Sequence, residues 1–219
     1  MQYDVIIIGG GQAGAMSAIT LRQQKFSGRI LLISNEGYLP YQRPPLSKAF
    51  LTDLLLTESL YIKSGAYYKR NKIDILMNDT VELIDRNKKN IILENGGKHS
   101  YQKLVLATGS ELNILDITCD KKNIYYLRTI DDSIKIRSLL EKQQKIVIVG
   151  AGYIGLEIAA AAIQKNQQVI VLEADNRVMS RSVCPKTSNF FEAIHKKQGV
   201  SIKQKFWFNP CRDKISNIL

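Results

Sequence analysis

Two stretches of the chain share one order of apolar, glycine and polar positions. The first, 3–36, reads "YDVIIIGGGQAGAMSAITLRQQKFSGRILLISNE", and the second, 145–175, reads "KIVIVGAGYIGLEIAAAAIQKNQQVIVLEAD". Their apolar runs are rich in β-branched residues and nearly continuous, which is typical of parallel strands covered on both faces. Each stretch therefore predicts a strand, a crossover helix and a second parallel strand, and the chain as a whole predicts an α/β fold.

The segment between these two units has a different pattern. An alternating run at 80–84 is followed by "NIILE", by a turn at Asn95-Gly96-Gly97 and by the apolar strand "KLVLATG". Alternation interrupted by glycine and asparagine turns predicts short paired strands. We therefore expect a small β-meander within the first unit.

Two more helices are predicted outside the repeated units. "RTIDDSIKIRSLLEKQQ" has helical periodicity, with Asp131 or Asp132 as its cap. "PKTSNFFEAIHKKQG" predicts a helix that starts near Pro185 and is closed by Gly199, after which "VSIKQ" begins a strand. The final stretch, "KFWFNPCRDKISNIL", follows no pattern that predicts an element.

Composition narrows the class of protein. The chain has 219 residues, 45% hydrophobic and 23% charged, and a net charge of +11 that is spread in short pairs. No motif accompanies that charge, so we expect no nucleic-acid partner, although an acidic protein partner fits it. No apolar run approaches the length of a membrane span, and the start does not resemble a signal peptide, so we expect no membrane association and a cytoplasmic protein.

Cysteine placement excludes several kinds of site. The three cysteines, Cys119, Cys184 and Cys211, form no CxxC pair and have no metal-ligand spacing. We therefore expect no metal and isolated reduced thiols. Disulfide reductases need cysteines in or near the segment "SNEGYLPYQRPPLSK", which has none.

Each unit carries a glycine fingerprint at its strand-to-helix turn. The fingerprints are Gly9-x-Gly11-x-x-Gly14 and Gly150-x-Gly152-x-x-Gly155. Such glycines allow a tight turn and close approach of a pyrophosphate to the helix N-terminus. The units are therefore predicted to be Rossmann-like dinucleotide-binding units.

The second strands end in groups that suit ribose hydroxyls. Asn35 and Glu36 end the first, and Glu173 ends the second. A carboxylate there favours NADH over NADPH because it repels a 2′-phosphate, although Arg177 lies near enough in sequence to weaken that preference. Two dinucleotide sites suggest a bound flavin reduced by a diffusible nicotinamide, whereas one site would suggest a simple dehydrogenase.

Several motifs together resemble one family. "GGGQAG", "LPYQRPPLSK", "LVLATGS", "YLRTIDD", "VIVGAGYIGLEIA" and "VIVLEADNRVMSRSV" occur in order between residue 3 and about residue 204. This combination resembles the ferredoxin and rubredoxin reductases, a subgroup of the FAD-dependent pyridine nucleotide-disulfide oxidoreductases that includes putidaredoxin reductase and the apoptosis-inducing factor. The resemblance implies that the first fingerprint binds FAD, the second binds NADH, and electrons pass to a small iron-sulfur protein such as a ferredoxin or rubredoxin.

The resemblance also implies roles for individual residues. Those expected to bind a cofactor are the fingerprint glycines, Ala13, Asn35, Glu36, Arg43, Lys48, Val81, Ala107, Thr108, Gly109, Arg128, Tyr153, Ile154, Glu157 and Glu173. Lys48 and Glu157 are further expected to form a catalytic ion pair beside the flavin. A carboxylate near a helix N-terminus that receives a pyrophosphate needs a cationic partner, which supports this pairing. Tyr153 either stacks on the flavin or fills space between domains.

The expected domains follow the same resemblance. They are an FAD-binding segment, 1–112, an NAD(P)-binding segment, 113–205, and a tail, 206–219, with both binding units incomplete. The tail resembles the product of a frameshift or early stop, or else a short cap over an exposed edge. The alternative function is a non-catalytic remnant with at most weak nucleotide binding. His195 is expected to be a surface or packing residue, and His99 is placed in a polar turn without a role.

Overall fold

The computed structural model describes residues 1–115 and 121–206. Cys119, Cys211 and the predicted tail after residue 206 lie outside these residues. Contacts divide the chain into two compact units, one formed by 1–42 and 57–111 and the other by 43–56 and 112–219. The chain therefore leaves the first unit after Gln42, contributes residues 43–56, here termed the proline loop, to the second unit, and returns at Thr57.

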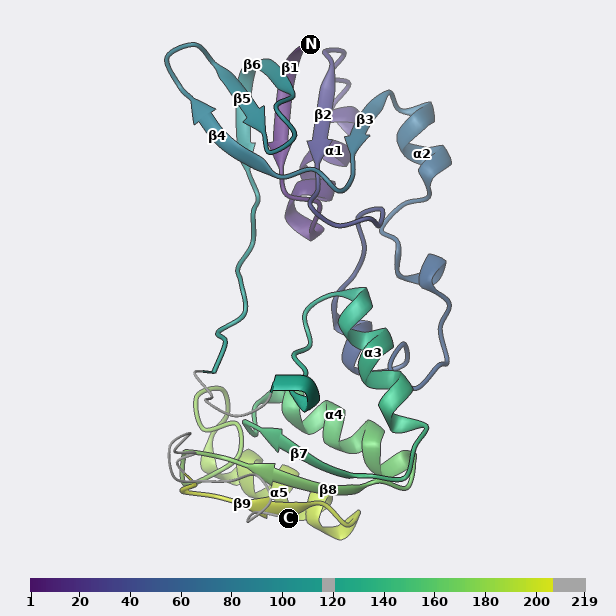
Figure 1. Cartoon of the computed structure of the whole chain (residues 1–219), viewed down its shortest axis with the longest axis vertical. Coiled ribbons are helices and arrows are strands. Elements are labelled where there is room, and N and C mark those ends of the chain that lie inside the picture. The colour runs from purple at the N-terminus through teal and green to yellow at the C-terminus, as the bar shows by residue number, and fades with distance from the viewer. Residues whose placement is uncertain (116–120, 207–219) are drawn as a thin grey trace. The chain divides into compact units, whose positions relative to one another are not determined.

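The first unit has a six-stranded sheet of order β3-β2-β1-β6-β5-β4 (Figure 1). Its strands are β1 (Gln2–Ile8), β2 (Ile30–Ile33), β3 (Ile73–Leu76), β4 (Val81–Asp85), β5 (Asn90–Leu93) and β6 (Lys98–Leu106). The first four in spatial order are parallel, whereas β5 pairs antiparallel with β4 and with the start of β6. The helices are α1 (Gln12–Gln23), α2 (Gly65–Arg70) and the 3-10 turn Thr57–Leu60.

Burial explains why β1 and β2 have continuous apolar sequences. The four residues Ile30–Ile33 are all buried, as are Val5–Ile8. Side chains on alternate sides belong to two different clusters, one with Ile6 and Leu31 and the other with Ile7 and Leu32. Both faces of these strands are covered, as a parallel sheet requires.

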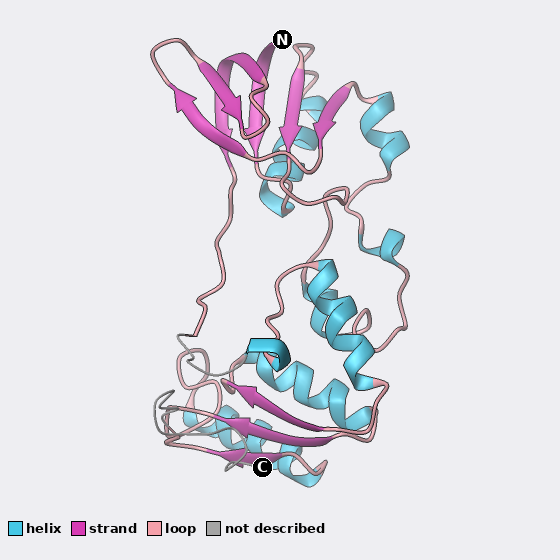
Figure 2. Cartoon of the chain, in the orientation of Figure 1, coloured by secondary structure: helices cyan, strands magenta, loops and turns pink. Residues whose placement is uncertain are grey.

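The second unit has a three-stranded parallel sheet of order β7-β8-β9. Its elements are the 3-10 turns Pro44–Ser47 and Lys121–Asn123, α3 (Ile130–Leu140), β7 (Lys145–Val149), α4 (Tyr153–Gln164), β8 (Gln168–Leu172), α5 (Pro185–Lys197) and β9 (Ser201–Lys203) (Figure 2). One core joins these elements, with Leu51 from the proline loop among its members. The predicted α/β class, with two Rossmann-like units and a meander in the first, is confirmed.

Two local predictions were wrong. The cap of α3 is Thr129, whose hydroxyl accepts from the amide of Asp132, while the Asp132 carboxylate accepts from the Thr129 amide. A threonine-led capping box therefore replaces the predicted aspartate cap. His99 lies in β6 and faces the ring of Tyr3 at 5.9 Å between centroids, not in a polar turn. In the part of the chain that the structure describes, no helix is long and apolar enough to cross a membrane.

Candidate functional site

The first fingerprint turn contains two glycines that the fold itself requires. Gly9 has a φ of +118°, and a Cβ there would lie 2.1 Å from the carbonyl oxygen of Ala107. A Cβ on Gly14 would lie 1.9 Å from the carbonyl oxygen of Gly9. These contacts bring α1 close to the end of β1 and bring the "ATG" segment beside the turn. Gly9 and Gly14 are therefore needed for packing, with or without a ligand.

The packing of the chain does not require a glycine at position 11. Its φ of −78° suits any residue, and a Cβ there would meet no atom within 4 Å. The helix that follows has no side-chain cap and no acidic residue in its first turn, so its first amides are left to another acceptor. A phosphate group fits this open, electropositive helix N-terminus. The residues present are therefore compatible with the pyrophosphate of a dinucleotide.

The second fingerprint turn repeats this geometry. Gly150 has a φ of +100°, and a Cβ on Gly155 would lie 2.0 Å from its carbonyl oxygen. Gly152 has a φ of −77°, an open surrounding, and begins α4 without a side-chain cap or an acidic first turn. Each unit thus leaves an equivalent space open at the corresponding position of its fingerprint turn.

The second strands end differently in the two units. Ile8 pairs with Ile33 and Val149 pairs with Leu172, so Ser34 occupies the position that Glu173 has in the second unit. Ser34 is buried, and a Cβ on Gly10 would lie 2.4 Å from its Oγ. This contact explains why the first turn has a third glycine where the second has alanine.

Glu173 is held by the fingerprint turn beside it. Its Oε2 accepts from the amide of Ala151 at 2.6 Å, and its Oε1 accepts from the amide of Asp175 at 2.9 Å. These two bonds fix the carboxylate at the carboxyl end of β8. Arg177 donates instead to the carbonyl oxygens of Val183 at 2.8 Å and Ser180 at 2.6 Å, so its guanidinium is engaged with the chain.

Asn35 and Glu36 lie two and three positions beyond the end of β2, directly after Ser34. Asn35 is exposed, whereas Glu36 is half-buried and its Oε2 accepts from the Tyr41 hydroxyl at 2.5 Å. The exposed amide therefore has more room for a ribose than the engaged carboxylate.

The other predicted residues of the first unit lie on β4 and after β6. Val81 begins β4 at a β-bulge, and Thr108 and Gly109 are exposed, with Gly109 at a φ of +75°.

The proline loop is fixed to α3 by buried contacts. Pro44 opens a single 3-10 turn, where its fixed φ suits the first helical position. The carbonyl oxygen of Leu46 accepts from the hydroxyl of Ser133 at 2.7 Å, and both residues are buried. Arg43 donates to the carbonyl oxygen of Arg128 at 2.5 Å. The loop therefore belongs to the second unit.

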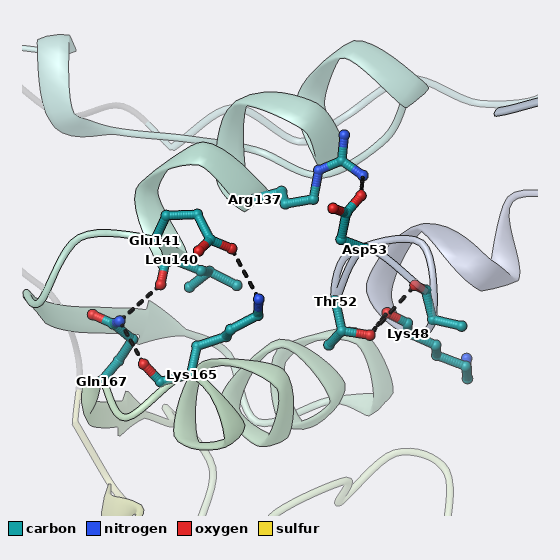
Figure 3. A network of polar contacts seen from close by, with 9 residues as sticks. Lys48, Thr52, Asp53, Arg137, Leu140, Glu141, Lys165 and Gln167 are labelled. Atoms are coloured by element: carbon teal, nitrogen blue, oxygen red, sulfur yellow. Dashed lines mark hydrogen bonds and ion pairs between the residues drawn. The ribbon is translucent and has the colours of Figure 1, made fainter. Parts of the chain in front are cut away.

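Further contacts hold residues 50–53 of the proline loop. Arg137 of α3 forms a salt bridge with Asp53 at 2.5 Å, and its guanidinium lies over the ring of Phe50 at 5.3 Å. Figure 3 shows this pair together with the Thr52 hydroxyl, which donates to the carbonyl oxygen of Lys48 at 3.4 Å. These contacts hold the chain that directly follows Lys48.

Lys48 and Glu157 form the ion pair that was predicted. The Nζ of Lys48 lies 2.8 Å from Oε1 of Glu157, and their side chains are 52% and 28% exposed. Ser47, which the sequence did not single out, donates from its Oγ to Oε2 of Glu157 at 2.5 Å. The predicted pair is confirmed as a contact, and a serine is added to it.

This ion pair lies in the wall of a cavity of about 300 Å³. The cavity is lined by Arg43, Pro44, Leu46, Ser47, Lys48, Leu127, Arg128, Tyr153, Ile154 and Glu157. Tyr153 and Ile154 are 53% and 54% exposed. An apolar wall with a few charged groups is the usual lining of a cofactor site.

The remaining titratable candidates lie elsewhere. Burial lowers the pKa of His195, in the last turn of α5, which agrees with a packing residue. Cys184 precedes α5 and is exposed, and a hydrogen bond with Thr187 lowers the pKa of its thiol. Within the described residues, no group of three His, Cys, Asp or Glu side chains could hold a metal ion.

Comparisons with known proteins agree on one family. The family model described as pyridine nucleotide-disulphide oxidoreductase matches residues 3–206. Rubredoxin-NAD(+) reductase of Pseudomonas putida is 39% identical over 202 residues, which are 91% of this chain and 52% of that protein. Putidaredoxin reductase CamA of the same species is 37% identical over 204 residues, 91% of this chain and 48% of that protein.

Solved structures give the same result. The covalent putidaredoxin reductase-putidaredoxin complex matches with a TM-score of 0.91 and 36% identity, covering 94% of this chain and 51% of the other. NADH:rubredoxin oxidoreductase from Clostridium acetobutylicum matches with a TM-score of 0.82 and 26% identity, covering 95% and 54%. The chain thus spans about half the length of the relatives that it matches.

Proposed function

The chain belongs to the pyridine nucleotide-disulphide oxidoreductase family, and we propose that it is the cofactor-binding part of an NADH-dependent reductase for a small iron-sulfur protein. The names of its relatives support this direction, since they include a rubredoxin-NAD(+) reductase and a putidaredoxin reductase. FAD and NADH are the cofactors of this proposal, with NADPH less favoured.

The observation that carries the proposal is the Lys48 to Glu157 pair at the cavity wall. A fixed ammonium stabilises negative charge that develops close to it, and it needs no reorganisation to do so. When bound, FAD takes a hydride from NADH and supplies the electron transfer that no side chain can perform. In this proposal Lys48 and Glu157 are the catalytic residues, because they line the place of the flavin ring.

The fingerprint turns supply the binding of the two pyrophosphates. Gly11 and the N-terminus of α1, with Ala13 exposed in its first turn, would hold that of FAD, and Gly152 with α4 would hold that of NADH. Asn35 and Glu36 would take the ribose of FAD. Arg43, Arg128, Tyr153 and Ile154 would surround the flavin, and Val81 with the segment 107–109 would contact FAD in the first unit.

The preference for NADH over NADPH follows from two residues of the loop after β8, Glu173 and Arg177. The Glu173 carboxylate is fixed where a ribose would lie, and Arg177 is engaged with two carbonyl oxygens. A 2′-phosphate would therefore meet the negative charge of Glu173, and Arg177 would have to leave its two carbonyl oxygens to offset it. We expect NADH to bind about tenfold more tightly than NADPH, as measured by calorimetry. Equal affinities would contradict this assignment, and Glu173→Ala should narrow the difference.

The electron acceptor is proposed from relatives and charge together. The net charge of +11 suits an acidic partner such as a small ferredoxin or rubredoxin. No nucleic acid or membrane partner is proposed.

Cofactor binding can be tested on the purified chain. After incubation with FAD and gel filtration, the protein should keep a visible flavin band that NADH bleaches in the absence of oxygen. A colourless protein that still binds NADH weakly would instead support the alternative, a non-catalytic chain with nucleotide-binding turns. Gly152→Ala serves as the matched control, since it should keep the flavin band and slow its bleaching.

A further inference from the structure

Ser47 carries a buried hydroxyl that the proposed function leaves without a task. The residue is 5% exposed and ends the 3-10 turn of the proline loop. Its Oγ lies 2.5 Å from Oε2 of Glu157 and 3.5 Å from the carbonyl oxygen of Pro44. A serine hydroxyl has one hydrogen to donate, so the short contact with the carboxylate takes it.

Glu157 therefore receives one donor on each of its two oxygens. Ser47 donates to Oε2, and the Lys48 ammonium contacts Oε1 at 2.8 Å. The last torsion of a glutamate side chain is broad, so a single donor would leave the carboxylate plane poorly defined. Two donors on separate oxygens fix this plane, and they leave Oε1 as the oxygen that faces the lysine.

The position of the Lys48 ammonium depends on the orientation of the Glu157 carboxylate. The Lys48 side chain is 52% exposed, and within the described residues its one other hydrogen bond is a long one to the carbonyl oxygen of Pro44 at 3.3 Å. A long, half-exposed lysine keeps a single geometry only when its partner is itself fixed, because the ion pair has to offset the side-chain entropy.

We propose that Ser47 is a positioning residue that orients Glu157, so that the carboxylate holds the Lys48 ammonium at the cavity wall. The use of that ammonium rests on the proposed function. The orientation itself is a property of the second unit, because the proline loop and α4 both belong to it.

The first test measures how quickly Lys48 is acetylated in the 219-residue chain without added nucleotide. N-hydroxysuccinimidyl acetate labels free amines, and mass spectrometry of peptides gives the rate at each lysine. In Ser47→Ala, Lys48 should react roughly threefold to tenfold faster, which corresponds to the loss of one ordinary hydrogen bond. Glu157→Gln sets the rate for an unpaired Lys48, and the Ser47→Ala rate should lie between it and the wild-type rate.

Two controls distinguish a local effect at Lys48 from a general destabilisation of the second unit. Lys165 pairs with Glu141 at 2.9 Å in the same unit, so its rate should be the same in every variant (Figure 3). Ser138→Ala removes a hydroxyl that donates within its own helix, to the carbonyl oxygen of Lys135, and it should leave the Lys48 rate unchanged. An equal or slower Lys48 rate in Ser47→Ala overturns the proposal, and so does an equal acceleration of Lys165.

The outcome is independent of the flavin. Labelling needs no cofactor, so a chain that binds no FAD would refute the proposed function and still decide the role of Ser47. An unchanged Lys48 rate would refute the positioning role whatever the flavin does. Where FAD binds, Ser47→Ala should slow bleaching by NADH less than Lys48→Ala does.

Discussion

At the scale of single residues, the six fingerprint glycines divide into two kinds. Gly9, Gly14, Gly150 and Gly155 are held by backbone contacts or by a positive φ, so the chain needs them in order to fold. Gly11 and Gly152 have ordinary φ values and open space in place of a side chain. We propose that a ligand occupies the space beside these two glycines.

This division predicts different effects for two alanine substitutions, one within α1 and one in the turn before it. Gly14→Ala should lower the free energy of unfolding by about 1–3 kcal/mol, because its Cβ would press on the carbonyl oxygen of Gly9. Gly11→Ala should leave that free energy nearly unchanged and weaken FAD binding. Urea denaturation and FAD titration measure the two effects. Normal FAD affinity in Gly11→Ala would show that the open space does not receive the cofactor.

His99 gives a prediction about pH at the same scale. Burial beside Tyr3 lowers the pKa of His99, so the folded state favours the neutral ring. Its contribution to stability is therefore present above the unfolded pKa of about 6.5 and is lost as the pH falls through the lower folded pKa. The melting temperature should fall between about pH 7 and about pH 5, and it should fall less in His99→Leu. An identical fall in both proteins would contradict this contribution.

At the scale of elements, the capping box of α3 supports the site indirectly. The box is formed by Thr129 and Asp132, and the next residue is Ser133, which holds the carbonyl oxygen of Leu46. A frayed first turn would therefore release the proline loop from α3. The helix start thus connects a local sequence signal to the position of Lys48.

Thr129→Ala tests this connection. Loss of the cap should cost about 1 kcal/mol of stability and raise the acetylation rate of Lys48. The exposed Ser138→Ala, in the same helix, is the control and should change neither quantity. Chemical denaturation and peptide mass spectrometry provide both readings. A destabilised Thr129→Ala variant with an unchanged Lys48 acetylation rate would show that the helix cap does not influence the position of Lys48.

At the scale of the whole molecule, sequence predicted the elements better than their contacts. The continuous apolar runs at β1, β2 and β8 specify buried parallel strands, because that environment leaves no polar face. The equally apolar run at β7 forms an edge strand in which only Ile148 is buried, so the expectation that both of its faces are covered was wrong. The ion pair of Lys48 and Glu157 was predicted only with help from the family resemblance. Neither its spacing nor its charges would have selected these two residues from the 51 charged side chains, 31 basic and 20 acidic.

The serines of the site show why some contacts escape sequence analysis. Ser34, Ser47 and Ser133 are all buried and contact the site, yet serine occurs in turns, caps and surfaces alike. Their roles depend on which backbone or carboxylate is packed against them, and this is decided by tertiary structure. The one available signal was the third glycine of "GGG", which reports the close approach of Ser34 to Gly10.

We propose that Lys48, paired with Glu157, acts on a flavin reduced by NADH. The most direct test of this claim is the rate at which NADH bleaches the flavin band of the FAD-loaded chain, recorded by anaerobic stopped flow. Lys48→Ala should retain the flavin and be bleached roughly tenfold more slowly than the wild type, whereas Lys165→Ala should match the wild type. A Lys48→Ala protein that is bleached at the wild-type rate would contradict the claim.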